Sequence, residues 1–196
     1  MVGAGGIGCE LIKNLSKSGY KNITLLDFDN IEITNLNRQF YFRKEHVGRS
    51  KAETVKQMLE KLDNSIKIQA INASIYDPKF NQLFYKDFSL IFSCLDNMKA
   101  REHLAAQATK NGKPLIDAGT MSYFGQAYSS IRFRNSCHNC NPTHSEQTPA
   151  FCTIRSHPQL PLHCATYGKN FYDSFFGVNQ AESLSDKLKY SNYVKS

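Results

Sequence analysis

Residues 1–8 read Met-Val-Gly-Ala-Gly-Gly-Ile-Gly, so the chain opens on the glycine spacing G-x-G-x-x-G. In dinucleotide-binding folds this spacing follows a buried strand and begins a helix, because glycine lets the backbone approach a phosphate closely. Apolar residues behind the motif recur at helical spacing as far as Gly19, where we expect the helix to end. Only Met1 and Val2 precede the motif, so we expect the chain to start inside a domain, with its first strand truncated.

Short apolar runs alternate with amphipathic segments along the next 110 or so residues. The predicted strands are 23–26, 67–71, 90–94 and 114–118. After the first helix, a second is predicted to begin at Lys51, and two more are predicted at 80–88 and 101–110. Ser50 and Glu53 have the spacing of a capping box, which fixes the start of the second helix. Residues 126–133 alternate in polarity and are expected to extend the sheet antiparallel. This order predicts an α/β fold with a doubly wound, mostly parallel Rossmann-like sheet.

Composition excludes several classes of function. The net charge is +7, but no run of five basic residues occurs, so we expect a solvated basic surface and no nucleic-acid partner. No apolar run reaches the 18 or so residues of a membrane span, and no signal peptide is present, so we expect no membrane partner. The chain is too large and too rich in core residues to need disulfides, and Cys9 and Cys94 are expected to be core thiols.

Two aspartates follow predicted strands. Asp27 comes 19 residues after Gly8 and ends the next strand, which is the place for an acid that accepts hydrogen bonds from a ribose. Asp96 follows residues 90–94 in the same way. Two acids at this edge of a sheet suit ribose binding and Mg²⁺, although each could simply cap a following turn.

Basic and amide side chains provide candidates for phosphate binding. Lys51 stands at the first position of a capped helix, where free N–H groups and a partial positive charge favour an anion. A bound phosphate would offset the unfavourable cation at that position, although an exposed surface lysine remains the alternative. Arg38 lies in the polar segment 35–40, and its planar fork fits phosphate oxygens, unless the segment is only a polar loop.

Taken in order, these motifs resemble ubiquitin-like-protein activating enzymes, which share an adenylation fold with bacterial ThiF- and MoeB-type adenylyltransferases. The segments that carry the resemblance are 3–8, 27–29, 35–40, 48–52 and 95–97. The SUMO-type branch is the most similar, on residues 117–120, Tyr123, 125–126, 152–155, Pro158, Pro161 and 163–164. The resemblance extends over nearly the whole chain to about Gly177.

The resemblance implies an ATP site. It assigns to that site Gly3, Gly5, Gly6, Gly8, Asp27, Asp29, Asn35, Arg38, Gln39, Lys51, Asp96 and Asn97. Asp27 would hold the ribose, and Asp96 would bind Mg²⁺. Asn35, Arg38 and Lys51 would contact the phosphates and stabilise charge during attack. Arg38 and Lys51 are the catalytic residues among them, and Gln39 would support them. The implied reaction is adenylation of the C-terminal glycine of a modifier, with release of pyrophosphate.

Cys137 and Cys140 form a C-x-x-C knuckle, which is half of a four-ligand structural zinc site. In the family the second pair lies far downstream, beyond the end of this chain. His138 or His144 could substitute, and a redox C-x-x-C is the rival interpretation.

Cys152 is the candidate nucleophile. It follows a proline-containing segment and precedes Arg155, and a nearby cation favours the thiolate, which is the attacking form. On local pattern Cys164 is an equal candidate, because it follows His163. The resemblance decides for Cys152, which would take the modifier from its adenylate as a thioester.

The expected organisation has three parts: an ATP-binding adenylation domain at 1–134, a zinc half-knuckle and catalytic-cysteine segment at 135–177, and a polar linker or the start of a missing domain at 178–196. The resemblance implies three partners: a SUMO-type modifier, a non-catalytic subunit of the same fold in a heterodimer, and a conjugating enzyme. It also implies location in the nucleus and cytoplasm. We expect this piece alone to be inactive or nearly so.

Three alternatives remain open. The modifier could be ubiquitin or of the neddylation type. The glycine motif and Asp27 also allow an NAD-dependent oxidoreductase, in which Arg38, Lys51 and the half-knuckle have no role. A binding-only pseudoenzyme subunit would be expected to lack Lys51 and Cys152, and both are present.

Overall fold

The computed structural model describes residues 1–121, 124–137, 140, 161, 164–165, 167–169 and 172. The chain divides into two compact units, Met1–Ser145 and Glu146–Ser196, and the elements below belong to the first. The predictions for Cys152, His138, His144, Tyr123 and the polar segment 178–196 lie outside the described residues. In the part of the chain that is described, no helix combines the length and apolar character needed to cross a bilayer.

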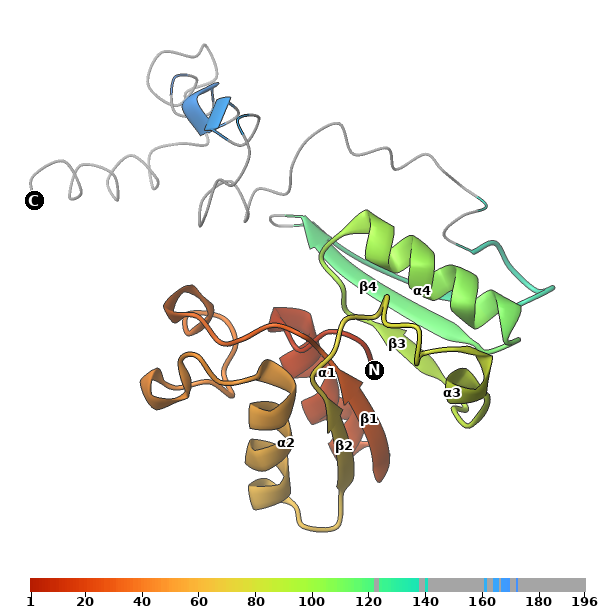
Figure 1. Cartoon of the computed structure of the whole chain (residues 1–196), viewed down its shortest axis with the longest axis horizontal. Helices are drawn as coiled ribbons and strands as arrows, with labels where there is room; N and C mark the ends of the chain where they lie inside the picture. The colour runs from red at the N-terminus through yellow and green to blue at the C-terminus, as the bar shows by residue number, and fades with distance from the viewer. Residues whose placement is uncertain are drawn as a thin grey trace, which may run out of the picture. The chain divides into compact units, whose positions relative to one another are not determined.

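Helices and strands alternate along the first unit (Figure 1). In chain order they are α1 (Gly6–Lys17), β1 (Asn22–Leu26), α2 (Lys51–Leu62), β2 (Lys67–Ile71), α3 (Gln82–Lys86), β3 (Ile91–Ser93), α4 (Met98–Lys110), β4 (Leu115–Met121) and β5 (Phe124–Ser130). Each strand and helix predicted up to residue 133 has a counterpart, but β5 covers Phe124–Ser130 rather than 126–133, because the Ile131 N–H donates to the Asn135 side chain and a turn follows. Gly19 has a φ of +90°, as expected for a glycine just past the end of α1.

The strands form one sheet whose halves meet at Val2. Val2 bridges Leu26 of β1 on one side and Ser93 of β3 on the other, both in parallel. Its N–H donates to Phe92 O and its carbonyl accepts from Cys94 N, each at 2.8 Å. With the β1–β2 and β3–β4 pairs, the order is β2-β1-Val2-β3-β4-β5. Among the strand pairs of the described residues, β4–β5 alone is antiparallel, as predicted.

Each face of the sheet carries its own apolar cluster. Successive residues of a strand point to opposite faces, and Leu25 belongs to one cluster while Leu26 belongs to the other. The Leu25 cluster contains residues of α1 and α2, and the Leu26 cluster contains residues of α3 and α4. Helices therefore cover both faces, which is the doubly wound arrangement.

Two helices differ from their predicted bounds. α4 begins at Met98 rather than at residue 101, because the Asn97 side chain accepts from Ala100 N at 2.9 Å and caps the helix. α3 is shorter than the predicted 80–88, because Asn81 caps its start and the helix ends at Lys86.

Candidate active site

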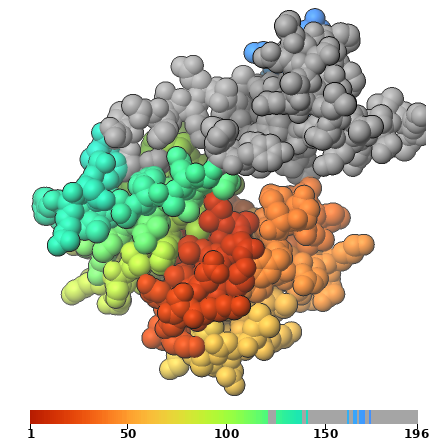
Figure 2. All heavy atoms as spheres, turned by 180° about the vertical axis from the view of Figure 1, so that it is seen from behind, coloured from red at the N-terminus to blue at the C-terminus, as the bar shows by residue number. Residues whose placement is uncertain are grey.

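The glycine motif lies where the strand order of the sheet reverses. From Val2 the chain passes through α1 to β1 on one side, whereas β3 lies on the other. In open α/β sheets, ligands bind outside the carboxyl ends of the strands at this switch point. Seen from behind, the surface of the amino-terminal segment lies between that of the segment after β1 (orange) and that of β3, α4 and β4 (green) (Figure 2).

Two glycines of the motif allow close packing that no other residue permits. Gly3 has a φ of +99°, and a Cβ there would lie 2.5 Å from Cys94 O at the end of β3. A Cβ on Gly8 would lie 2.2 Å from Gly3 O. By contrast, a Cβ on Gly5 would have no other atom within 4 Å. Gly3 and Gly8 therefore seat α1 against the sheet, and Gly5 leaves room beside the first N–H groups of α1, which have no partner inside the helix.

Asp27 connects the end of β1 to the glycine motif. The N–H of Ala4 donates to Asp27 Oδ2 at 2.6 Å, and the N–H of Asp29 donates to Oδ1 at 2.8 Å. The residue is 8% exposed. Burial raises the pKa of the Asp27 carboxyl above its ordinary value, against the two N–H donors and the charge of Lys51. Each oxygen retains a lone pair that can accept from a ribose hydroxyl.

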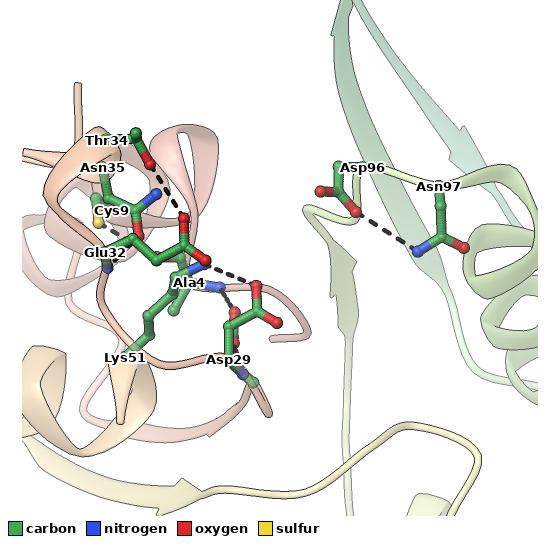
Figure 3. Close-up of polar contacts among 10 residues, drawn as sticks. Ala4, Cys9, Asp29, Glu32, Thr34, Asn35, Lys51, Asp96 and Asn97 are labelled. Atoms are coloured by element: carbon green, nitrogen blue, oxygen red, sulfur yellow. Dashed lines mark hydrogen bonds and ion pairs between the residues drawn. The ribbon is translucent and has the colours of Figure 1, made fainter. Parts of the chain in front are cut away.

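Lys51 is buried at the first position of α2, with only 7% of the residue exposed. Its Nζ donates to Asp29 Oδ2 at 2.7 Å, and its backbone N–H donates to Asp29 O at 3.0 Å (Figure 3). The alternative of an exposed surface lysine is wrong. Asp29 offsets the cost of burying this cation at a helix N-terminus.

The polar segment after β1 also approaches α1. Asn35 is buried, and its Oδ1 accepts from Glu32 N at 2.9 Å, which fixes the turn. The exposed Arg38 donates to Thr34 O at 2.7 Å, and its Cγ lies 4.0 Å from the Cβ position of Gly6. The predicted phosphate ligand Arg38 thus lies beside the start of α1.

Gln39 is buried behind that segment. Its Oε1 has no hydrogen-bond partner in the described part of the chain. The predicted supporting role is compatible with this position and is not decided by it.

Asp96 and Asn97 follow β3 in a separate loop (Figure 3). Asp96 is exposed, and Asn97 Nδ2 donates to its Oδ1 at 3.5 Å. Because Gly3 packs against Cys94, this loop starts beside the glycine motif. The sequence places Asp96 at the same edge of the sheet as Asp27, but no hydrogen bond between described residues joins Asp96 to the Lys51–Asp29 pair.

Sequence reasoning missed a neighbouring group of buried residues. Arg101 of α4 contacts the carbonyl of Leu95, and its guanidinium approaches Asp117 of β4. Arg101 is predicted to be a helical residue and nothing more. The only signal in the sequence is an arginine on a helix next to the Asp96 loop, which is not specific enough to find the contact.

Four of the five described cysteines fall into two groups, and the fifth, Cys164, is exposed. Cys9 and Cys94 are buried, as predicted, and burial raises the pKa of each thiol to about 12. Cys137 and Cys140 follow β5, and their Sγ atoms lie 3.3 Å apart. Ser130, the last residue of β5, pairs with Leu115, the first residue of β4. The knuckle segment therefore begins at the edge of the sheet opposite to the glycine motif.

The charged residues at this edge of the sheet fit a nucleoside triphosphate with a divalent cation. Asp27, Asp29 and Asp96 supply three negative charges at this edge, and Lys51 and Arg38 supply two positive ones. A triphosphate would add further negative charge, so a cation is needed, and Mg²⁺ takes one or two carboxylates together with phosphate oxygens. The described residues contain no group of three or more His, Cys, Asp or Glu that could hold a metal by itself.

The fold, with its glycine motif at the switch point of a mostly parallel sheet, is of the Rossmann type. The chain belongs to the ThiF family, which it matches over residues 1–176.

Among curated relatives, the chain is 41% identical over 186 residues to SUMO-activating enzyme subunit 2 of Dictyostelium discoideum, covering 95% of this chain and 28% of the relative. It is 39% identical over 178 residues to SUMO-activating enzyme subunit uba-2 of Caenorhabditis elegans, covering 90% of this chain and 31% of the relative. The chain thus spans less than a third of these two proteins. The NEDD8-activating enzyme E1 catalytic subunit of C. elegans is also similar, at 36% identity over 184 residues, covering 86% of this chain and 42% of the relative.

Among solved structures, the chain is similar to the crystal structure of E. coli tRNA N6-threonylcarbamoyladenosine dehydratase, TcdA. The TM-score is 0.57 at 26% sequence identity, and the match covers 61% of this chain and 50% of that chain.

Proposed function

We propose that the protein containing this chain activates a ubiquitin-like modifier of the SUMO type with ATP. The observation that carries the proposal is the buried Lys51, held 2.7 Å from Asp29 at the start of α2. A second bond fixes Asp27 to the amide of Ala4 in the glycine motif. The similarity to SUMO-activating subunits supports the choice of modifier.

The first step joins the modifier to AMP. A carboxylate oxygen of its C-terminal glycine attacks the α-phosphorus of ATP, an acyl–O–P bond forms, and the bond to the β-phosphate breaks to release pyrophosphate. This step needs alignment and charge stabilisation more than covalent help from the enzyme. Asp27 positions the ribose, while Lys51 and Arg38 stabilise the charge on the phosphates.

Metal ions have separate roles in this proposal. Asp96 would hold Mg²⁺, which when bound offsets negative charge on the phosphates. Cys137 and Cys140 would supply half of a structural zinc site. Their 3.3 Å sulfur separation is close to the roughly 3.8 Å between two thiolates of a tetrahedral site with Zn–S bonds of about 2.3 Å.

In the second step, the Cys152 thiolate attacks the acyl carbon of the adenylate, and AMP leaves as the thioester forms. The buried thiols of Cys9 and Cys94 are unsuitable for this role, because each has a pKa of about 12. A partner subunit of the same fold, a conjugating enzyme, and action in the nucleus and cytoplasm belong to the same proposal.

Pyrophosphate exchange tests the proposal and its runner-up. The complete protein, with its partner subunit, is incubated with ATP, labelled pyrophosphate and one modifier at a time: SUMO, NEDD8 or ubiquitin. We expect exchange with SUMO and little with the other two. Exchange with NEDD8 alone would assign the protein to the neddylation type, to which the C. elegans subunit with 36% identity belongs. Absence of exchange with every modifier would refute adenylation.

A further inference from the structure

Arg101 lies where its guanidinium can hold the loop that carries Asp96. It stands in the first turn of α4 and is 8% exposed. Its Nε and Nη2 both donate to the carbonyl of Leu95, at 2.8 and 2.6 Å. Leu95 directly precedes Asp96, so these two short bonds fix the peptide from which the Asp96 side chain projects.

The other contacts of the guanidinium are to β4 and are longer. Nη1 lies 3.4 Å from Asp117 Oδ2, and Nη2 lies 3.4 Å from Ala118 O. Asp117 is 1% exposed, and its Oδ1 has no hydrogen-bond partner among the described residues. Asp117 therefore acts on Arg101 mainly through charge, and the tightest hydrogen bonds go to Leu95.

Gly119 leaves the space that the Arg101 guanidinium occupies. A Cβ at this position would lie 2.4 Å from Arg101 Nη2, 2.5 Å from Nη1 and 2.8 Å from Cζ. The φ of Gly119 is not in the left-handed region, so backbone conformation does not demand a glycine here. The guanidinium occupies the place where a side chain would begin.

A buried Arg101 packed against Gly119 is not what stability alone would favour. Burial of a guanidinium is costly unless it is compensated, and a cation in the first turn of a helix opposes the helix dipole. An apolar residue at position 101 and alanine at position 119 would fill the same space without that cost. The geometry points to a role at the Asp96 loop.

We infer that Arg101 is a positioning residue for the divalent cation of the nucleotide, and that it acts by holding the Leu95 carbonyl and thereby the Asp96 carboxylate. Gly119 maintains the space that the guanidinium needs. This inference rests on the proposed function, because Asp96 is the metal ligand of that proposal.

Two substitutions disturb the arrangement from opposite sides. Arg101→Lys keeps the charge beside Asp117 but loses the planar fork that donates twice to Leu95. Gly119→Ala keeps Arg101 and displaces its guanidinium. Gly125→Ala is the matched control on the paired strand β5, because a Cβ there would meet nothing closer than 4.0 Å.

The test is calorimetric binding of ATP to the complete protein, once with Mg²⁺ and once with EDTA. Because residues around metal ligands affect metal affinity by about 10–100-fold, we expect each variant to weaken Mg²⁺-dependent ATP binding about ten-fold. Binding in EDTA should change less than about two-fold, and Gly125→Ala should match the wild type in both buffers. The double variant should resemble the worse single one, whereas independent sites would multiply to about 100-fold.

Equal losses with Mg²⁺ and with EDTA would indicate a merely structural role and overturn the inference, as would two single variants that bind like the wild type. If Gly119→Ala does not fold, Arg101→Lys decides alone by the same comparison. Binding needs no modifier, so a wild-type protein that binds Mg²⁺–ATP but catalyses no exchange would refute the proposed function alone. A wild-type protein that binds no ATP would overturn both.

Discussion

A buried lysine has few structural reasons to exist. Lys51 gives up its hydration at the start of α2, and its ion-pair partner Asp29 has a half-exposed side chain, 45% accessible. That carboxylate can remain solvated if Lys51 turns toward another anion. The pair is therefore suited to release a cation to a phosphate with little reorganisation of the fold.

Lys51→Ala should separate catalysis from stability. We expect modifier-dependent pyrophosphate exchange to fall by about 10²–10³-fold, the loss typical of one charge-stabilising group. The thermal unfolding midpoint should change little, because Asp29 stays partly in water. Lys61→Ala, at the exposed end of the same helix, is the control and should retain wild-type exchange. Unchanged exchange in Lys51→Ala would remove the lysine from the site.

The cysteines should differ sharply in reactivity. With a pKa of about 12, the thiols of Cys9 and Cys94 are ionised to only about one part in 10⁴ at pH 8. Iodoacetamide applied to the native protein and followed by mass spectrometry should modify the exposed Cys164 and leave Cys9 and Cys94 intact until denaturant is added. Rapid native labelling of Cys94 would contradict the packing of Gly3 against it.

At the scale of elements, the glycines of the motif have two different roles: packing α1 against the sheet and leaving room for the nucleotide. Substitutions at Gly8 and Gly5 can separate them. Gly8→Ala places a Cβ against the carbonyl oxygen of Gly3 and should lower the free energy of unfolding by about 1–3 kcal/mol or more. Gly5→Ala meets open space and should leave that energy within about 0.5 kcal/mol of the wild type, while ATP affinity falls. Chemical denaturation and calorimetry measure the two effects. A stable Gly8→Ala protein would show that α1 is seated differently.

Helix starts are predictable from the sequence where the capping residues are unambiguous. Ser50 and Glu53 fixed the start of α2, and the side chain of Ser50 accepts from Glu53 N. The residue pattern predicts a start at residue 101, whereas α4 begins at Met98, because the Asn97 side chain caps the helix. The spacing of apolar residues alone does not reveal such a cap.

At the scale of the molecule, the site depends on Val2, where the two halves of the sheet meet. Val2 bonds to both β1 and β3, so the loop after it lies between the loops that carry Asp27 and Asp96. This convergence was predictable, because parallel strands bring their carboxyl ends to one edge. The contact of Arg101 with Leu95, Asp117 and Gly119 was not, because it depends on how α4 packs across β4.

In the proposed function, this edge of the sheet activates a carboxylate with ATP before any cysteine takes part. Pyrophosphate exchange with a SUMO-type modifier tests it most directly in three proteins: wild type, Asp96→Ala and Cys152→Ala. We expect exchange in the wild type, loss of exchange in Asp96→Ala, and retained exchange without thioester in Cys152→Ala. Exchange that survives in Asp96→Ala, or disappears in Cys152→Ala, would contradict it.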